Sequence, residues 1–226
     1  IGFKAVNKNT TIICVSNFQK SQVLFYWGKE IESRTHVVYN TGSFNNATNI
    51  VSPQNIVITI AHVIDYKNPS FWLEVVRRSS KNNANLRFVW VGDGPLFNEY
   101  KEMTKDDTNI EFLGYKDKQE IQKLLSHTIL YFGFSTFESL GISVIDSIQH
   151  GIPAIVTDVG GLPEIIENGK NGYVINTPDE AVNKCNELIK NRSLYNKFSR
   201  TAVEIYTKKF SDNCWKKQIS DIMVAK

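Results

Sequence analysis

The chain has few of the residues that cross-link small proteins or hold metal ions. Its 3 cysteines in 226 residues, Cys14, Cys185 and Cys214, lie far apart and form no CxxC or Cys/His cluster. This spacing argues against a zinc site and against a disulfide scaffold. We expect free thiols with a structural role, which suits a reducing compartment.

Long apolar runs and a strong net charge are missing as well. No segment approaches the ~20 apolar residues of a membrane span, and no signal-peptide pattern is present. A formal charge of +3, with no long Lys/Arg run, argues against a nucleic-acid-binding surface. A hydrophobic content of 42% is that of a soluble globular protein with a sizeable core. We therefore expect a cytoplasmic protein without a nucleic-acid partner.

Apolar runs alternate along the chain with segments of helical period. Strands are expected at residues 12–16, 36–40, 56–60, 86–91, 110–113, 128–134, 154–157 and 172–175. Helices are expected at 17–28, from 69 onward, between 95 and 110, and at 118–127, 139–150, 178–190, 194–206 and 211–223. Continuous apolar strands that alternate with helices predict an α/β fold with a doubly wound parallel sheet, covered on both faces.

The best candidate linker is the polar, turn-rich stretch 41–49, which Pro53 ends. It divides the chain into a strand–helix–strand remnant of a preceding domain at 1–52 and one complete Rossmann-like domain at 53–210. A closing helix at 211–226 is expected to pack toward the preceding domain. The chain opens with Ile1 rather than Met, from which we expect a fragment or a processed product.

The most informative stretch is FSTFESLGISVID, residues 134–146. A strand ends there, a turn carries Glu138, and a helix begins at a small residue. We expect the N–H groups of Leu140, Gly141 and Ile142 to be unpaired first-turn donors, which favour an anion. Gly141 would let a phosphate approach the backbone.

Glu138 and Asp146 are eight residues apart. On one helix, that spacing is a rise of ~12 Å and a rotation of ~80° away from the same face. A glycosidase pair needs carboxyl groups ~5–9.5 Å apart, so these two acids better suit the two ends of a long ligand. A nucleoside diphosphate sugar has that shape. The alternative is that Glu138 is a helix N-terminal acid favoured by the dipole and Asp146 a solvated helix residue.

The next stretch is QHGIPAIVTDVGGLPEIIENGKNGYV, residues 149–174. Together with Glu138 and Asp146 it resembles the signature of family-4 retaining glycosyltransferases, which have the glycosyltransferase B (GT-B) fold of two facing Rossmann-like domains. The family pattern is Glu, seven residues, Glu, a small residue, Gly-x-Pro, a strand, a Gly-Gly turn and Pro-Glu. This chain keeps the pattern except for the second Glu, which is Asp146.

The resemblance extends over most of the chain and is weakest from Lys184 onward. The VGDGP of residues 91–95 looks like the family's Gly-x-Gly-Pro turn, and residues 112–115 look like the strand end that meets the nucleobase through main-chain groups. His62 and Lys67 look like the Arg-x4-Lys pair that grips the diphosphate, with His in place of Arg.

The resemblance implies a role for each matching residue. Glu138 would hold hydroxyls of the donor sugar, and Lys67 would be the cation on the leaving diphosphate. Residues 139–142 would offer main-chain donors to the phosphates, and Asp146 would take the ribose. The predicted donor-binding residues are His62, Gly92, Gly94, Leu113, Gly114, Tyr115, Ser135, Ser139, Leu140, Gly141, Ile142 and Asp146. The alternatives are that Lys67 is a surface lysine, His62 a strand-end residue and Ser135 a cap of its turn.

The resemblance also implies the reaction. It predicts a hexosyltransferase that retains the anomeric configuration, uses a nucleoside diphosphate sugar as donor and needs no cofactor. No metal is implied, because Lys67 and backbone dipoles take its part and the sequence has no Asp-x-Asp triplet. A sugar or lipid-linked glycan acceptor would bind through the missing N-terminal domain. Bacterial polysaccharide or glycoconjugate synthesis is the commonest setting, and it allows peripheral association of the full-length protein with the inner face of the cell membrane.

Other functions remain open beside this one. The chain is expected to bind a nucleoside diphosphate but to be inactive alone, as the donor-binding half of an enzyme. One alternative is a nucleotide-sugar-binding subunit that a separate acceptor subunit completes, and another is a sugar-nucleotide epimerase of the same fold. A dinucleotide dehydrogenase is disfavoured, because no G-x-G-x-x-G opens the first helix after the linker.

Overall fold

The computed structural model of the protein describes residues 10–44 and 55–224, which form two parallel sheets. Of the predicted linker, residues 45–49 and Pro53 lie outside these ranges. The smaller sheet belongs to residues 10–40, which we call the N-terminal unit. Its elements are β1 (Ile12–Cys14), α1 (Asn17–Trp27), the 3₁₀ helix η2 (Lys29–Arg34) and β2 (Thr35–Val37). Among the described helices, none is long and apolar enough to cross a lipid bilayer.

The larger sheet has six strands, all parallel, in the order β5-β4-β3-β6-β7-β8. Its strands are β3 (Ile56–Ile60), β4 (Arg87–Val91), β5 (Ile110–Phe112), β6 (Thr128–Gly133), β7 (Ala154–Thr157) and β8 (Gly172–Ile175). The strand order reverses between β3 and β6, so the loops after these two strands diverge at the carboxyl edge of the sheet. The doubly wound parallel sheet predicted from the sequence is confirmed.

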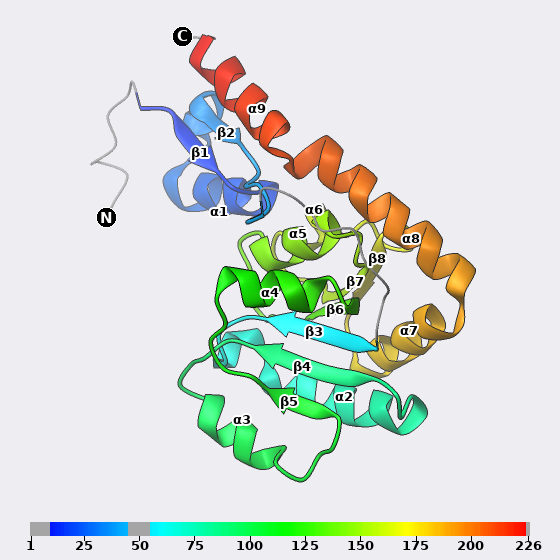
Figure 1. The fold of residues 1–226 in the computed structure, drawn as a ribbon. Coiled ribbons are helices and arrows are strands. Elements are labelled where there is room, and N and C mark those ends of the chain that lie inside the picture. The colour runs from blue at the N-terminus through cyan, green and yellow to red at the C-terminus, as the bar shows by residue number, and fades with distance from the viewer. Residues whose placement is uncertain (1–9, 45–54, 225–226) are drawn as a thin grey trace.

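Helices cover both faces of the larger sheet, as α4 and α2 do on the two sides of β3 and β4 (Figure 1). The helices are the 3₁₀ helix η3 (Asp65–Lys67), α2 (Pro69–Asn82), α3 (Phe97–Met103), α4 (Lys118–Leu125), α5 (Ile142–Gln149), α6 (Leu162–Ile165), α7 (Pro178–Lys190), α8 (Arg192–Ile205), the π-helical turn η4 (Tyr206–Phe210) and α9 (Asp212–Val224). Local signals start several of them. Pro69 and Pro178 occupy first turns, and Asp117 and Thr177 form capping boxes.

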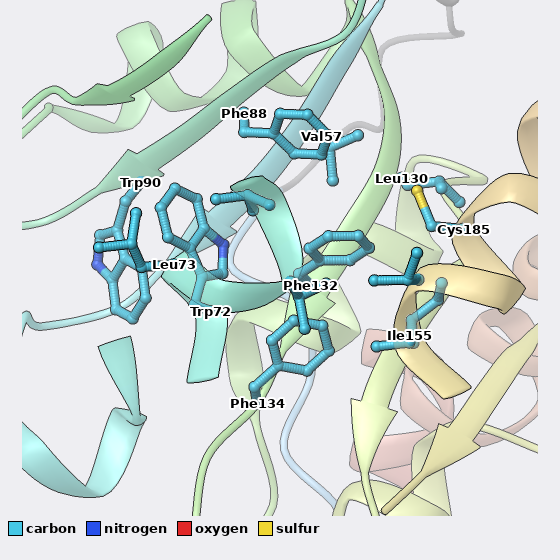
Figure 2. Close-up of a cluster of buried hydrophobic side chains, with 14 of the residues drawn as sticks. Val57, Trp72, Leu73, Phe88, Trp90, Leu130, Phe132, Phe134, Ile155 and Cys185 are labelled. Carbon is cyan, nitrogen blue, oxygen red and sulfur yellow. The ribbon is translucent and has the colours of Figure 1, made fainter. Parts of the chain in front are cut away.

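Each face of the larger sheet buries its own hydrophobic cluster, which is why its strands read as continuous apolar runs. On one face, the rings of Trp72 and Trp90 meet edge to face with centroids 5.2 Å apart (Figure 2). Phe132 and Cys185 join this cluster, and Cys185 is a buried free thiol, as expected. On the other face, Val89 is fully buried and belongs to a cluster that also holds residues of α4, α5 and α8.

The helix predicted at 139–150 begins later, because α5 starts at Ile142. Gly141 has a φ of +103°, a left-handed conformation outside the helix, and a Cβ at this position would lie 2.8 Å from the Leu162 side chain. Glu138 therefore lies in the loop before the helix. The turn predicted for Glu138 is confirmed, and only Asp146 of the two acids lies on α5.

The closing helix α9 follows η4 and extends toward the end of the molecule that holds the N-terminal unit (Figure 1). Trp215 and Lys216 of α9 line a hollow of about 490 Å³ together with residues 40–43, which lead out of that unit. No side chain of α9 within the described part is buried. The domain boundaries at 1–52, 53–210 and 211–226 stay predictions.

Candidate functional site

The loops after β3 and β6 bring the two predicted catalytic side chains together. Lys67 ends the 3₁₀ helix η3, Glu138 lies in the loop before α5, and the two form an ion pair. Their side chains are 18% and 19% exposed. The main chain also joins the loops, because the Thr136 N–H donates to the Tyr66 carbonyl oxygen at 2.8 Å. The pair is thus partly desolvated and lies where the strand order reverses, the usual place for a ligand in such a sheet.

A hollow of about 310 Å³ adjoins this ion pair, and we call it the central hollow. It lies between the N-terminal unit, which contributes Val15 and Asn40, and the larger sheet with its loops. Its lining residues are Val15, Asn40, Lys67, Glu138, Ser139, Leu140, Gly141, Ile142 and Ser143. The structure therefore brings together the residues predicted for the diphosphate and the donor sugar, except His62, and adds Ser143 to them.

The start of α5 offers main-chain donors beside the central hollow. Gly141 is the N-cap, and the Val144 N–H already bonds to the Gly141 carbonyl oxygen at 3.0 Å. Across residues 10–44 and 55–224, the N–H groups of Ile142 and Ser143 have no hydrogen-bond partner. Of the three predicted first-turn donors, Ile142 is confirmed, whereas Leu140 and Gly141 precede the first turn. The unpaired N–H groups and the positive end of the helix dipole favour an anion here.

A glycine turn after β7 supports the backbone of the Glu138 loop. Gly160 has a φ of +60°, and a Cβ there would overlap the Glu138 carbonyl oxygen. Gly161 donates its N–H to the same oxygen at 3.1 Å. A Cβ on Gly161 would lie 2.5 Å from the Ser139 carbonyl oxygen. The Gly-Gly turn is needed because two backbones touch at the border of the central hollow.

Asp146 faces the segment that leaves the N-terminal unit and does not line the central hollow. Its side chain is 7% exposed, and its Oδ1 accepts the Ser43 N–H at 2.5 Å. Burial raises the pKa of this carboxyl group, against the opposing effect of the Ser43 hydrogen bonds. One turn further along α5, the Gln149 amide donates to the Phe44 carbonyl oxygen at 2.6 Å. The predicted contact of Asp146 with a ribose stays a prediction.

His62 and Lys67 line different hollows. His62 is exposed and lines a hollow of about 460 Å³ with Ile64, Asp93, Gly94 and Pro95, whereas Lys67 lines the central hollow. Their joint grip on a diphosphate stays a prediction.

The turns after β4 and β5 are fastened to each other and to the loop after β3. The Gly92 N–H donates to the Gly114 carbonyl oxygen at 2.9 Å, and a Cβ on Gly94 would lie 2.6 Å from a main-chain oxygen of that loop. Leu113, before Gly114, lines a further hollow of about 390 Å³ beside α4. Tyr115, after it, is 78% exposed. The predicted nucleobase residues Leu113, Gly114 and Tyr115 thus lie in a turn that main-chain hydrogen bonding fixes to the turn after β4.

The two predicted serines occupy different depths. Ser135 is 6% exposed, and its carbonyl oxygen accepts the Thr157 hydroxyl at 2.6 Å. Ser139 lines the central hollow, and its carbonyl oxygen accepts the Ser16 hydroxyl of the N-terminal unit at 2.6 Å. Ser139 therefore lies where the unit meets the site.

Glu164 of α6 fastens the N-terminal unit to the site, a role that sequence reasoning missed. Its carboxylate accepts the Asn17 N–H at 2.9 Å, the Phe18 N–H at 2.8 Å and the Tyr39 hydroxyl at 2.8 Å. Burial raises the pKa of Glu164, but these donors outweigh burial and leave the pKa below its ordinary value of 4.5. The Pro-Glu of the motif was visible, but its partners lie 125 to 147 residues away in the sequence.

Known proteins similar to this chain are sugar transferases. Residues 42–204 match the sequence model of the family described as Glycosyl transferases group 1. The chain is 25% identical, over 96% of its length, to an uncharacterized glycosyltransferase of Methanocaldococcus jannaschii, of which it covers 59%. It is 27% identical, over 67% of its length, to N-acetyl-alpha-D-glucosaminyl L-malate synthase of Bacillus anthracis, of which it covers 41%.

Solved structures share the fold. TarM of S. aureus superposes with a TM-score of 0.83 at 23% identity, over 94% of this chain and 43% of TarM. HepE of Anabaena superposes with a TM-score of 0.80 at 18% identity, over 96% of this chain and 64% of HepE. The fold is of the GT-B type, and the chain spans about half the length of the curated relatives it matches. Because the family match covers most of its length, the chain belongs to the glycosyl transferases group 1 family.

Proposed function

We propose that the chain is the donor-binding half of a retaining, family-4 hexosyltransferase that takes its sugar from a nucleoside diphosphate sugar. One observation carries the proposal: Lys67, Glu138 and the start of α5 line the same central hollow. A cation and unpaired N–H groups suit a diphosphate, and a neighbouring carboxylate suits sugar hydroxyls.

Related structures support uridine diphosphate as the first ligand to test. TarM was crystallised with UDP, HepE with UDP-glucose, and the pneumococcal O-GlcNAc transferase GtfA with UDP and GlcNAc. A further relative, 25% identical over 91% of this chain, is a poly(ribitol-phosphate) alpha-N-acetylglucosaminyltransferase of Staphylococcus aureus. UDP-N-acetylglucosamine and UDP-glucose are therefore the donors that we propose to test first.

The ion pair suggests how the donor is held. In the free chain, Lys67 and Glu138 neutralise each other. A diphosphate competes for the Lys67 ammonium group, which leaves the Glu138 carboxylate free to accept sugar hydroxyls. Hydrogen bonds to charged groups contribute ~1.5–3 kcal/mol each. Lys67 and the N–H groups of α5 would stabilise the charge that develops on the leaving phosphate. The proposed mechanism uses no cofactor for this purpose.

Retention requires the acceptor hydroxyl to approach from the face that the diphosphate leaves. Its oxygen bonds to the anomeric carbon as the bond to the phosphate oxygen breaks, and its proton passes to the departing diphosphate. Val15 and Asn40 form the side of the central hollow from which an acceptor would come. We propose a sugar or lipid-linked glycan as acceptor, in polysaccharide or glycoconjugate synthesis.

Calorimetric titration with UDP and UDP sugars tests the proposal. We expect wild-type chain to bind UDP and Lys67→Ala to bind it ~10- to 100-fold more weakly, whereas Lys81→Ala, at the end of α2, should bind as wild type. Glu138→Ala should keep its affinity for UDP, because its loss frees Lys67, and should lose the affinity that the sugar adds. If no nucleoside diphosphate binds, the proposal is wrong, and equal losses of UDP and UDP-sugar affinity would reject the role of Glu138.

The same reagents separate the alternatives. An epimerase would convert a UDP sugar without any acceptor, whereas a transferase leaves the sugar unchanged until an acceptor is added. A binding subunit would bind the donor equally well but would need a separate protein for transfer.

A further inference from the structure

A buried tyrosine hydroxyl lies directly behind the central hollow. Tyr131 of β6 is 2% exposed, and its hydroxyl lies 2.7 Å from Ser143 Oγ in the first turn of α5. The same hydroxyl lies 3.3 Å from the Ile60 nitrogen and 3.2 Å from the Ile60 carbonyl oxygen, at the end of β3. It therefore joins three elements, β3, β6 and α5, at the point where the strand order reverses.

The hydrogen-bond inventory of these groups is short. A phenol has one proton to donate and can also accept. Tyr131 accepts the Ile60 N–H, so its own proton can go to the Ile60 carbonyl oxygen or to Ser143 Oγ. The Tyr131 hydroxyl lies 2.7 Å from Ser143 Oγ but 3.2 Å from the Ile60 carbonyl oxygen. The hydrogen bond to Ser143 is therefore the better one. Burial also raises the pKa of Tyr131, which keeps the phenol protonated and able to donate.

Ser143 has a free proton once it accepts from Tyr131. Ser143 is partly exposed and lines the central hollow beside the unpaired N–H groups of Ile142 and Ser143 itself. A serine that could donate back to Tyr131 would leave its proton pointing away from the hollow. The proton of Tyr131 removes that option, so the serine proton is available to a ligand in the hollow.

We propose that Ser143 donates its hydroxyl proton to the diphosphate of the donor and that Tyr131 is the positioning residue that orients it. This inference rests on the proposed donor site and adds a side-chain donor to it. The Tyr131 ring belongs to the apolar cluster that also holds Val144, Ile145 and Val156, so a phenylalanine would fill the same space. The hydroxyl of Tyr131 therefore serves its polar contacts and not the packing of the strand.

A double-mutant cycle tests the pair. We expect Ser143→Ala to bind UDP about tenfold more weakly than wild type, since a hydrogen bond to a charged group is lost. Tyr131→Phe should weaken UDP binding ~3- to 10-fold in the wild-type background and leave it unchanged in the Ser143→Ala background. Ser143→Thr keeps the hydroxyl and should bind as wild type. Uridine, which has no phosphate, should bind all variants equally.

The outcomes distinguish this inference from the donor site itself. Binding of UDP by wild type supports the donor site, whatever the cycle shows. Equal weakening by Tyr131→Phe in both backgrounds would overturn the positioning role, and unchanged UDP binding by Ser143→Ala would overturn the whole inference. If Tyr131→Phe does not fold, a crystal structure with UDP decides: Ser143 Oγ must lie within hydrogen-bond distance of both a phosphate oxygen and the Tyr131 hydroxyl.

Discussion

Among the glycines of the described residues, Gly160 is the one where an added Cβ would come nearest to the backbone of Glu138. Gly160 has a φ of +60°, and a Cβ there would collide with the Glu138 carbonyl oxygen. Gly169 has a similar φ of +77°, but a Cβ there would have nothing within 4 Å. Comparing substitutions at the two glycines therefore distinguishes the strain of a left-handed conformation from a collision with the Glu138 loop.

We expect Gly169→Ala to lower the free energy of unfolding by ~1 kcal/mol, the cost of placing a Cβ in the left-handed region. Gly160→Ala should cost ~2–4 kcal/mol, because it adds displacement of the Glu138 loop. It should also reduce the affinity for a UDP sugar relative to UDP. Chemical denaturation and calorimetry measure the two effects, and equal results for the two variants would contradict this account of Gly160.

Asp146 should make stability depend on pH. Burial raises its pKa above the ordinary 3.8, so ionisation is less favourable in the folded chain than in the unfolded chain. Its contribution to stability therefore decreases as the pH rises through the raised pKa. An asparagine keeps an oxygen for the Ser43 N–H but carries no charge. We expect Asp146→Asn to melt at a higher temperature than wild type at neutral pH, with the difference vanishing below the ordinary pKa. A wild type that is more stable at neutral pH would show that the charge is stabilising.

At the scale of elements, the start of α1 depends on Glu164. The Asn17 and Phe18 N–H groups at the start of α1 donate to the Glu164 carboxylate, which lies on α6. The pKa of Glu164 is lowered despite its burial, so the stabilisation is present above 4.5 and is lost as the pH falls through the lowered pKa. Glu167 also has a lowered pKa, but through the ammonium groups of Lys209 and Lys170. It is a matched control that does not touch α1.

We expect Glu164→Gln to lower the free energy of unfolding at neutral pH by about 1 kcal/mol, a value reduced by solvent screening. The difference from wild type should shrink as the pH falls below 4.5. Hydrogen exchange of the Asn17 and Phe18 amides should accelerate in Glu164→Gln and stay unchanged in Glu167→Gln. Equal acceleration in both variants would mean that general destabilisation, and not the loss of this contact, exposes α1.

The elements differ in how well the sequence predicts them. Strands such as β3 and β7 were predictable because both of their faces are buried and every residue is apolar or nearly so. The start of α5 was not, because Gly141 has a left-handed conformation and leaves no room for a Cβ beside Leu162 of another helix. The residues of the motif were visible, but the partners of Asp146 and Tyr131 were not. Those partners come from segments 103 and 71 residues away, and no local pattern reports such contacts.

For the whole molecule, the central hollow is a boundary between two parts. The loops of the larger sheet contribute the Lys67 ammonium group, the Glu138 carboxylate and the start of α5, while the N-terminal unit contributes Val15 and Asn40. On α1 of that unit, Phe25 and Tyr26 are 79% and 73% exposed, with their rings edge to face. Within the described residues, the wall on the acceptor side thus consists of Val15 and Asn40, and α1 of the same unit exposes two aromatic rings.

We expect the isolated chain to bind UDP and UDP sugars but to transfer no sugar. Positioning two reactants accounts for ~7–11 kcal/mol of an enzyme's barrier reduction, and in the proposed half-enzyme the described residues position the donor alone. Typical enzymes turn over at ~1–10³ s⁻¹, so loss of acceptor positioning should reduce UDP release to below ~10⁻² s⁻¹. The assay measures UDP released from UDP-N-acetylglucosamine and UDP-glucose, with and without a panel of sugar and lipid-linked acceptors. Acceptor-dependent release near 1 s⁻¹ would show that the N-terminal unit and the larger sheet suffice for catalysis, and the half-enzyme proposal would be wrong even though the donor site stands.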